Sequence, residues 1–453
     1  MKTLILKALA LAGVFILSQQ KILAQEKSAL NGYITRGLAS NESIRQQDFL
    51  LEKNIYALNE AKSLFMPTVD FKTDYTKAAG GRTIDVPIGD LENPVYATLN
   101  TLTGTNKFPQ LKNESILLNP DNFYDARFHT TMPLLNAELI YNKRIKRQQV
   151  DLQKTEVVLY KRELVKDIKT AYYNYAKALK AANIYQSSLK LVTENKRINT
   201  ALFNNQKVNR TAVVRSDNEV TKINSQLIAA NQDMQAARSY FNFLINSPLT
   251  DSIKVDSITL LPNEFLISDT AVEKREELTK LRIALALNEN ETGLAKSYIV
   301  PKIGTFLDLG SQAYGWAVNS SSRYYLFGVS LNWNLFASGK NTYEKKQAMA
   351  QQQSLEAEND YVEKQLRMQL SIAKNAYRSA VAKYGAAQSQ LLTAGQYYRD
   401  ELKLYKEGQV IYIELLDAQN QLINARLESN IALFDAWSRY ADIERANAGF
   451  NLN

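Results

Sequence analysis

Two long stretches of the chain carry hydrophobic or small residues in alternating steps of four and three positions. The first stretch runs from Leu164 to Val192 and the second from Leu366 to Ala394. A repeat that averages 3.5 residues is typical of helices that pack along a coiled-coil seam. Alanine at many of these positions predicts close helix packing, and the tyrosines between them predict a seam that is not entirely dry. The seam positions are Leu164, Ile168, Ala171, Tyr175, Ala178, Ala182, Tyr185, Leu189 and Val192 in the first stretch and Leu366, Leu370, Ala373, Tyr377, Ala380, Tyr384, Ala387, Leu391 and Ala394 in the second.

A second hydrophobic pattern repeats at every other residue and predicts four β-strands. The clearest case is "RYYLFGVSLNWNLF", residues 323–336, in which aromatic and aliphatic side chains alternate with Gly, Ser and Asn. Similar alternation predicts strands at about 66–76, 123–134 and 300–314. These segments are longer than ordinary globular strands and have the length of tilted membrane-spanning strands. Half-buried strands of a soluble protein are the simpler alternative.

The chain contains the same order of segments twice. The stretch "AKSLFMP" ends at Pro67, and "AKSYIVP" ends at Pro301, 234 positions later. Farther along, Tyr141 corresponds to Tyr343, only 202 positions later. The first copy is therefore longer by 32 residues. Its strand pair encloses the glycine-, proline- and asparagine-rich segment 77–121, which we predict to be a long loop.

The duplication predicts how the chain is organised into domains. Each repeat consists of a helix, a strand pair, a long helix, a turn and a return helix. The N-terminus has the pattern of a secretory signal peptide, because Lys2 and Lys7 precede the apolar run "ALALAGVFIL" and small Ala24 precedes the expected cleavage site. The predicted parts are a signal peptide (1–24), a first repeat (25–246), a connector (247–270) and a second repeat (271–453).

The helix lengths predict how the repeats combine. The long helix of the first repeat is predicted from about residue 135 to about residue 204, which is roughly 105 Å of helix. Its return helix, 210–246, covers about half of that length, and the opening helix of the second repeat, 271–297, covers the rest. Helix 411–447 and the N-terminal helix close the second repeat in the same way. Each long helix is thus matched by two shorter helices placed end to end.

The composition excludes several kinds of site. The sequence has no cysteine, which excludes disulfides and thiolate metal sites, and its one histidine, His129, has no metal-ligand neighbours at a useful spacing. It has no Ser/His/Asp set and no phosphate-binding glycine loop, so we predict neither an enzyme nor a bound cofactor. The net charge of +9 is spread along the predicted helices, which gives little support to nucleic-acid binding.

The number of predicted strands requires more than one chain. An open sheet edge cannot face lipid, so membrane strands must belong to a closed barrel. The smallest usual barrels have about eight strands, whereas this chain supplies four. Two, three or four chains would therefore have to combine their strands.

With these features in place, the sequence resembles the TolC family of outer membrane efflux proteins over nearly all of its mature part, about 27–447. The likeness rests on the doubled helix-to-strand junctions, on the strand exits "TMPLLNAE" and "LNWNLFASGK", and on the segment "YKEGQVIYIELLDAQNQLINAR". The exits match the family pattern Pro-Leu-Phe-x-Gly-Gly only in part. The first exit keeps Pro133 without the glycines, and the second keeps only Gly339.

The resemblance implies a mainly α-helical coiled-coil barrel joined to membrane strands, in which three chains form one 12-strand transmembrane barrel. It implies a homotrimer in the bacterial outer membrane that extends into the periplasm and joins a periplasmic adaptor protein and an inner-membrane transporter. Such a duct passes substrates outward by passive conduction through a gated tunnel, in efflux or in type I protein secretion. A periplasmic coiled-coil scaffold without channel activity is the alternative.

The resemblance also places the working residues at the free ends of the coiled coils. Tyr405, Glu414 and Asp417 occupy positions that line or hold a constriction in the family, and the two acids share a helix face. Without the resemblance they would be ordinary solvated carboxylates. The first copy departs from the family pattern, with Ala212 and Arg215 at the equivalent positions. We therefore hypothesise that Arg215 pairs with Asp417 or Glu414 of a neighbouring turn.

The turns themselves are a second group of candidates. Gly408 is predicted to supply the unusual backbone of the second turn, and its counterpart Gln206 predicts a first turn that has a different shape or is stiffer. Val410 replaces a basic residue that the family has there. Adaptor proteins dock near these tips in the family, and the candidates here are Gly408, Val410, Tyr412 and Val208. Three prolines mark the junctions of helix and strand, Pro67, Pro301 and Pro133. Five aromatic residues are candidates for a girdle at the membrane interface, Tyr314, Trp316, Tyr324, Tyr325 and Trp333.

Overall fold

The computed structural model describes residues 28–258, 261–262 and 269–452. The predicted signal peptide and part of the predicted connector lie outside the described residues. The chain divides into two compact units, each built from separate parts of the sequence. We call them the helical unit (residues 28–55, 148–287 and 351–452) and the sheet unit (residues 56–147 and 288–350). None of the helices in the described ranges is both long and apolar enough to cross a membrane.

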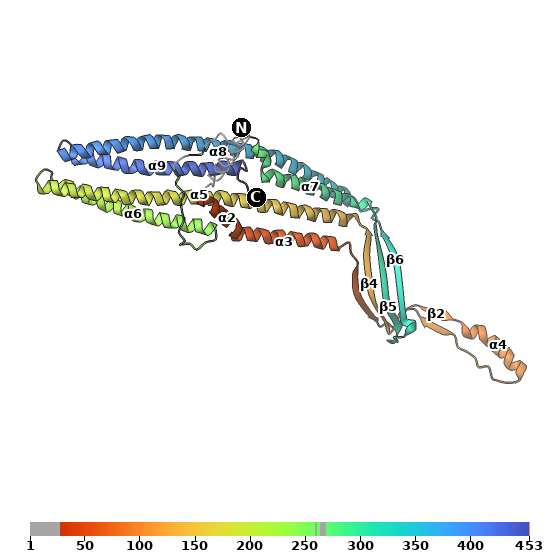
Figure 1. Ribbon diagram of the computed structural model, residues 1–453. Helices are drawn as coiled ribbons and strands as arrows, with labels where there is room; N and C mark the ends of the chain where they lie inside the picture. Colours follow the sequence, from red (N-terminus) through yellow and green to blue (C-terminus); the bar gives the residue numbers. More distant parts are fainter. Residues whose placement is uncertain (1–27, 259–260, 263–268, 453) are drawn as a thin grey trace, which may run out of the picture. The chain divides into compact units, whose positions relative to one another are not determined.

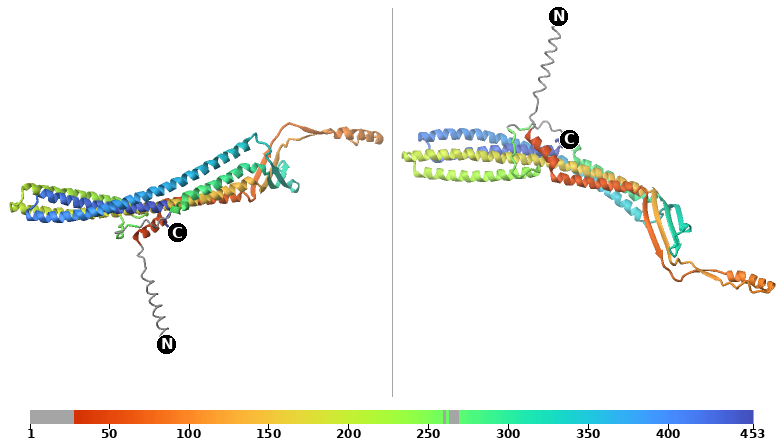
Figure 2. Two further views of the ribbon diagram at one scale, coloured as in Figure 1. Left: turned by 90° about the horizontal axis from the view of Figure 1, so that it is seen from above. Right: turned by 60° about the horizontal axis from the view of Figure 1, so that its bottom comes forward.

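The two longest helices have 68 residues each, α5 (Ala137–Asn204) and α8 (Lys340–Glu407). Each is followed by a return helix of 35 residues, α6 (Arg210–Leu244) or α9 (Tyr412–Ala446). Figures 1 and 2 show α6 beside α5 and α9 beside α8. Because α9 begins and ends 202 positions after α6, the return helices keep the offset found in the sequence. The mainly helical fold with a few strands is as predicted.

Three shorter helices complete this set. They are α2 (Ala29–Ser40), α3 (Glu42–Ser63) and α7 (Glu276–Lys296). The predicted start of α7 at residue 271 is wrong, because residues 269–274 form a short 3-10 helix. Glu276 and Glu277 occupy the first turn of α7, where negative charge favours the positive end of the helix dipole.

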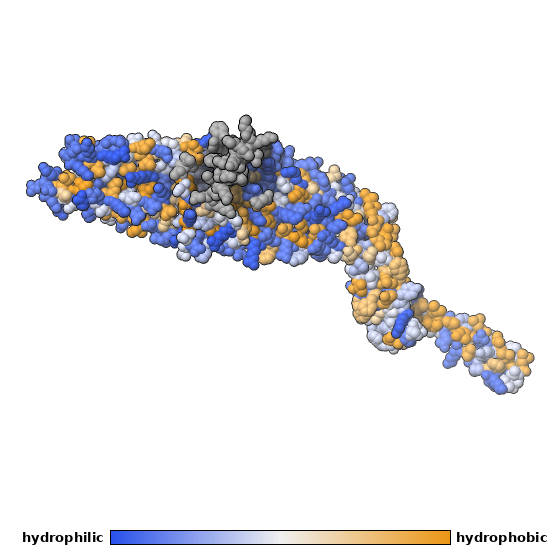
Figure 3. All heavy atoms as spheres, viewed as in Figure 1, coloured by the Kyte–Doolittle hydropathy of each residue, from blue (hydrophilic) through white to orange (hydrophobic). Residues whose placement is uncertain are grey.

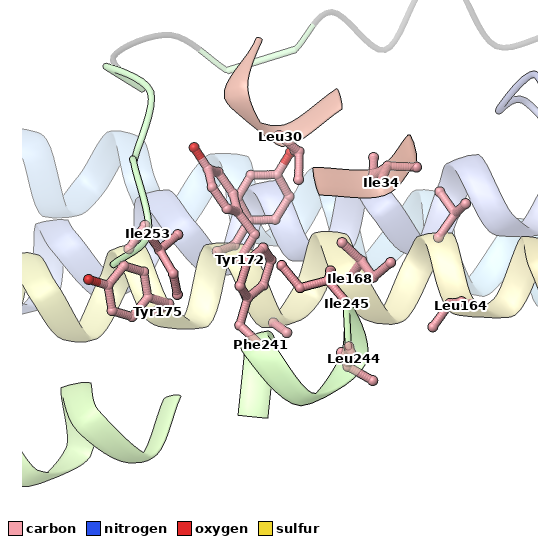
Figure 4. Close-up of a cluster of buried hydrophobic side chains, with 14 of the residues drawn as sticks. Leu30, Ile34, Leu164, Ile168, Tyr172, Tyr175, Phe241, Leu244, Ile245 and Ile253 are labelled. Atoms are coloured by element: carbon pink, nitrogen blue, oxygen red, sulfur yellow. The ribbon is translucent and has the colours of Figure 1, made fainter. Parts of the chain in front are cut away.

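A buried core holds α2, α5 and α6 together near the middle of the helical unit. Ile168 and Tyr172 of α5 are fully buried against Phe241 of α6, as Figure 4 shows. Gly37 brings α2 close to this core, since a Cβ at that position would lie 2.5 Å from Cδ1 of Ile168. The Tyr172 hydroxyl accepts a hydrogen bond from the backbone N–H of Asp256 at 2.7 Å, which ties the connector to α5.

The predicted coiled-coil seams face other helices within the chain. Every one of the eighteen seam positions is buried or half-buried, and none is exposed. In α5 the pattern continues beyond Val192 in steps of three and four to Asn195 and Asn199, which are also buried. The seam is therefore apolar over most of its length and becomes polar near the end of the helix.

A cluster of charged side chains joins α5, α7 and α9. The carboxylate of Glu277 accepts hydrogen bonds from Arg275 at 2.5 and 2.9 Å and from Arg445 of α9 at 2.9 Å. Arg445 also donates to Glu163 of α5 at 2.7 Å. Burial by itself raises the pKa of Glu277, but Arg275 and Arg445 outweigh it and lower the pKa to about 2. The cluster therefore stabilises the place where both ends of the second repeat meet the long helix of the first.

Replacing Glu277 with Gln should remove a pH-dependent part of the stability. The pKa falls from 4.5 to about 2 on folding, so the ionised carboxylate stabilises the fold above pH 4.5 and loses this effect as the pH falls toward 2. The lost contribution is about 3 kcal/mol. The free energy of unfolding, measured by chemical unfolding of the purified protein, should fall less between about pH 5 and about pH 3 in Glu277→Gln than in the wild type. Glu358→Gln, at an exposed carboxylate of α8, should behave like the wild type; equal slopes for Glu277→Gln and wild type would contradict the assignment.

The sheet unit contains a four-stranded antiparallel sheet in the order β1-β4-β5-β6. Its central pair, β4 with β5, joins the first repeat to the second. Strand β6 ends at Asn332, four residues earlier than predicted, because its partner β5 begins at Lys302, which pairs with Asn332. Residues 333–336 continue the alternating pattern without a partner strand. The strands are β1 (Thr68–Thr76), β4 (Phe123–Leu135), β5 (Lys302–Tyr314) and β6 (Arg323–Asn332).

The three junction prolines lie at the ends of these strands. Pro67 directly precedes β1 and Pro301 directly precedes β5, so neither has to donate to the strand ladder. Pro133 lies inside β4, at the irregularity where the register with β5 shifts. A proline is compatible with a strand at such a point because no ladder hydrogen bond is required of it.

One face of the sheet is hydrophobic and exposed. The residues on it are Val69, Phe71, Phe128, Leu309, Tyr325, Phe327, Val329 and Leu331, each between 51% and 77% exposed. Figure 3 shows hydrophobic residues over much of the visible sheet. Exposed apolar surface on this scale marks a protein or membrane interaction site.

The opposite face of the sheet is charged. Arg127 pairs with Asp125, and His129 pairs with Asp308 on the neighbouring strand. The Tyr324 hydroxyl donates to Asp125 at 2.8 Å, which links β6 to the same group. The sheet thus has one face suited to an apolar environment and one suited to water.

The segment 77–121 is not the long loop that we predicted. It is a hairpin whose tip is a helix, with β2 (Thr83–Val86), α4 (Ile88–Thr103) and β3 (Glu114–Leu117). Asn93 of α4 bonds both backbone groups of Leu111, at 2.7 and 2.9 Å, and Asn100 does the same to Phe108, at 3.1 and 2.7 Å. The asparagines that suggested a loop instead join the helix to the returning chain, and Gly104 ends the helix in a left-handed conformation.

Candidate functional site at the helical turns

The two turns that follow the long helices have the same backbone geometry. Gly408 has φ 76° and Gln206 has φ 57°, so both occupy the left-handed region. In the second turn the N–H of Gly408 donates to Tyr405 O at 3.1 Å, and that of Gln409 donates to Leu404 O at 3.0 Å. This pair of bonds is a Schellman motif. The first turn repeats it residue for residue at distances of 2.8 and 2.9 Å, so the prediction of a different shape is wrong.

The turns differ instead in how the next helix begins. Asn209 caps α6, and its side-chain oxygen accepts from the N–H of Ala212 at 3.2 Å. The equivalent residue before α9 is Ile411, whose side chain makes no cap. The first turn therefore combines a strained Gln206 with a good cap, and the second combines an unstrained Gly408 with no side-chain cap.

Tyr405, in the last turn of α8, is buried within the chain. It is 2% exposed, and its hydroxyl donates to Oδ1 of Asn199 on α5. Asn199 in turn donates to the backbone oxygen of Ala212 on α6 at 3.3 Å. Burial raises the pKa of Tyr405 to about 12, which keeps the hydroxyl protonated and able to donate. One Tyr–Asn contact thus connects three of the four helices at the tip.

Sequence reasoning missed a polar cluster just below this contact. Nδ2 of Asn195 on α5 donates to Oε1 of Gln419 on α9 at 2.7 Å, and the Tyr398 hydroxyl lies 3.4 Å from Asn195. All three side chains are buried. The sequence does contain an indication of this cluster, because Asn195 and Asn199 continue the heptad positions that end at Val192. Polar residues at such positions fix helix register at some cost in stability.

The predicted docking residues are only partly available at the surface. Tyr412 is buried and its ring lies 5.9 Å from that of Tyr405, so the prediction that it docks a partner does not fit. Val208 and Val410 are half-buried, and Gly408 is exposed. The predicted docking residues that remain accessible at the turns are therefore small or aliphatic.

The predicted acids lie on the outer side of α9, where a third carboxylate joins them. Glu414 and Asp417 are both exposed. Burial raises the pKa of Tyr397 on α8, and the negative charges of Glu401 on α8 and of Asp417 and Glu414 on α9 raise it further, so all three carboxylates act electrostatically on this hydroxyl. Arg215 is exposed on α6, and within the described part of the chain no ion pair includes it. Its pairing with another chain stays a prediction.

The tip combines buried hydrogen bonds with exposed carboxylates. In residues 28–258, 261–262 and 269–452 no group of three or more His, Asp or Glu side chains could hold a metal ion. What the tip does contain is a buried hydrogen-bonded core, two rigid turns and an acidic surface patch. Such features can hold helices together and attract cations.

Comparison with known proteins relates this fold to outer membrane channels. Residues 267–437 match the sequence model of the family described as outer membrane efflux protein. The search of curated proteins found no match. The fold is similar to the outer membrane protein VceC of Vibrio cholerae, with a TM-score of 0.74, 14% identity, and coverage of 92% of this chain and 95% of that chain.

Two further solved structures have similar folds. The CmeC outer membrane channel of Campylobacter jejuni gives a TM-score of 0.75 at 14% identity, covering 93% of this chain and 86% of that one. The open state of the MtrE outer membrane channel of Neisseria gonorrhoeae gives 0.73 at 17% identity, covering 92% and 88%. The likeness extends over both repeats.

Substitutions at the two turns should have opposite effects on stability. Gly408→Ala should destabilise the protein by about 1 kcal/mol, because alanine is strained at a positive φ. No heavy atom lies within 4 Å of a Cβ placed there, so the cost is confined to the backbone. Gln206→Gly should stabilise by a similar amount, measured as the midpoint of chemical unfolding. Gly385→Ala, inside α8 and equally uncrowded, should instead stabilise; destabilisation by both alanines alike would contradict this account.

Proposed function

We propose that this chain is an outer membrane efflux protein of the TolC family and acts as the exit duct of a tripartite export system. Its fold and the sequence of residues 267–437 support this proposal. It conducts substrates passively from the periplasmic side to the exterior and catalyses no reaction. It acts as a homotrimer in the bacterial outer membrane, with its helices in the periplasm. A periplasmic adaptor protein and an inner-membrane transporter are its partners, and the turns between the long and return helices are where the adaptor docks.

The two-sided sheet is the observation that carries this proposal. Its exposed hydrophobic face suits lipid, and its charged face suits a water-filled interior. The outer strands β1 and β6 each have a free edge within the described chain, and lipid tolerates no such edge. Pairing β1 of one protomer with β6 of the next would satisfy both edges. Three protomers would then form a 12-strand barrel.

The helical tip supplies the gate in this proposal. The acids Glu401, Glu414 and Asp417, repeated in each protomer, form a negative ring that attracts cations and repels anions. Arg215 of one protomer pairs with Asp417 or Glu414 of its neighbour and helps to hold the tip closed. The Tyr405–Asn199 contact keeps the helices of each protomer together while they move as one body.

A periplasmic scaffold without channel activity is not favoured. Such a protein would need the paired helices and their seams. It would have no use for a sheet whose hydrophobic side chains are more than half exposed, because water contact with that face costs roughly 25 cal/mol per Å². The charged opposite face would also lack a function.

The full-length protein purified in detergent should be a trimer by mass and should form channels in planar lipid bilayers. The trimer should depend on the sheet, because the proposed contact between protomers is the pairing of β1 with β6. A variant lacking residues 83–117, which removes only the hairpin beyond the sheet, should still assemble and conduct. A monomer without channel activity would rule out the duct.

Neutralising the acids at the tip should change which ions pass. Glu414→Gln/Asp417→Asn should lower the permeability of cations relative to anions by about tenfold, because the ring then loses most of its charge. Reversal potentials under a salt gradient measure this ratio. Glu428→Gln on the same helix, two heptads from Glu414, is the matched control and should leave the ratio near the wild-type value.

Arg215→Ala should raise the closed-state conductance, because the proposed pair between protomers would be lost. An unchanged closed-state conductance would contradict that pair without contradicting the acidic ring.

A further inference from the structure

The helix α4 at the tip of the hairpin has an exposed apolar seam. Its members are Ile88, Leu91, Val95, Thr98 and Leu102, which follow one another in steps of three and four. Leu91 is 68% exposed and Leu102 is 78% exposed, although both are large apolar side chains. This spacing is that of a helix packed lengthwise on another helix. The Thr98 hydroxyl donates to Pro94 O at 2.9 Å, so it brings no unpaired donor into the seam.

The other side of α4 is already occupied by its own hairpin. The ring of Tyr96 lies 5.6 Å from that of Phe108, and Asn93 and Asn100 bond the returning backbone. These contacts hold the helix in a fixed orientation with the seam turned away from the hairpin. In the described residues the seam has no partner helix.

Two possible occupants of the seam can be distinguished by charge. A helix that lies on a membrane surface is typically rich in Lys and Arg on its polar face. The charged residues of α4 are Asp90 and Glu92, and it has no Lys or Arg. Anionic lipid head groups would repel this acidic helix. A second α4 also carries Asp90 and Glu92, but none of the seam positions is charged, so it would cover the seam with uncharged side chains. A copy of the same helix is therefore the better fit.

The base of the hairpin adds a second observation. The hairpin leaves the sheet directly after β1, the edge strand that faces the next protomer in the proposed trimer. Its base is braced by an ion pair of Lys77 with Asp121 at 2.9 Å and by the Tyr75 hydroxyl, which donates to Asn122 at 2.8 Å. Trp316 stacks on the Tyr75 ring at 5.4 Å. Three hairpins would thus start from equivalent, fixed points around one axis.

We propose that the α4 helices of three protomers pack on one another through this seam and form a cap over the outer mouth of the duct. The proposal rests on the trimer of the proposed function. The packing extends the contact between protomers beyond the β1–β6 pairing and covers the apolar side chains that a single chain leaves in water. A solute leaving the duct has to pass between or around the three helices.

Because the chain contains no cysteine, single thiols can test the seam in the full-length protein. We would compare Val95→Cys and Leu102→Cys, on the seam, with Ala97→Cys, which is exposed on the same helix but off the seam. Each variant is purified in detergent, checked for trimer mass, oxidised mildly and run on a non-reducing gel. A disulfide needs Cα atoms within about 7 Å. Seam variants should shift to the dimer band, with at most two of every three chains crosslinked, while Ala97→Cys stays monomeric.

The outcomes separate this proposal from the proposed function. Seam variants that crosslink no more than Ala97→Cys in a protein of trimer mass would overturn the cap and leave the duct standing. Seam thiols that are protected from a water-soluble maleimide but do not crosslink would mean that lipid or another protein covers the seam, which also overturns the cap. A protein of monomer mass would overturn the trimer and the cap together.

Discussion

A sheet edge that cannot be left open in lipid is the constraint on which the rest of this molecule depends. Strands β1 and β6 lie at the two ends of the sheet, and the hydrophobic face between them rejects water. A single chain satisfies neither requirement. The duplication meets part of this constraint, because the pairing of β4 with β5 places one strand pair from each repeat in one sheet. In the proposed function, association of identical chains pairs the two remaining edges and closes the sheet into a duct.

The helices change in character along their length. Along most of α5 and α8 the buried positions are small or aliphatic residues interspersed with tyrosines. Near the turns the buried positions change to Asn195, Asn199 and Gln419, joined by tyrosine hydroxyls. Hydrogen bonds fix helix register more strictly than apolar contacts do. The end of the bundle where a gate would act is thus the part whose register is most closely specified.

The sequence predicted the features that depend on long periodic patterns. The helix bounds near 137–204 and 412–446, the strand pairs and the seams all follow from regular spacing over many residues. Features that depend on single contacts could not be predicted from such patterns. The end of β6 depends on where β5 begins, and Gln206 adopts the glycine-like conformation that its type disfavours. The sequence predicts a loop where α4 forms, because the segment that Asn93 and Asn100 bond cannot be recognised from the local sequence. At the tip, Glu401 and the buried asparagines became part of the site only once helices far apart in sequence were placed together.

The hairpin between β1 and β4 forms its own hydrogen bonds through Asn93 and Asn100, and its base is braced by the ion pair of Lys77 with Asp121. Its length and surface can therefore change in evolution at little more than the entropic cost of closing a longer loop. The sheet and the helices must keep their register to stay paired, whereas the hairpin must keep only its base. Chains that share the proposed duct can therefore differ in this hairpin while keeping the same sheet and helices.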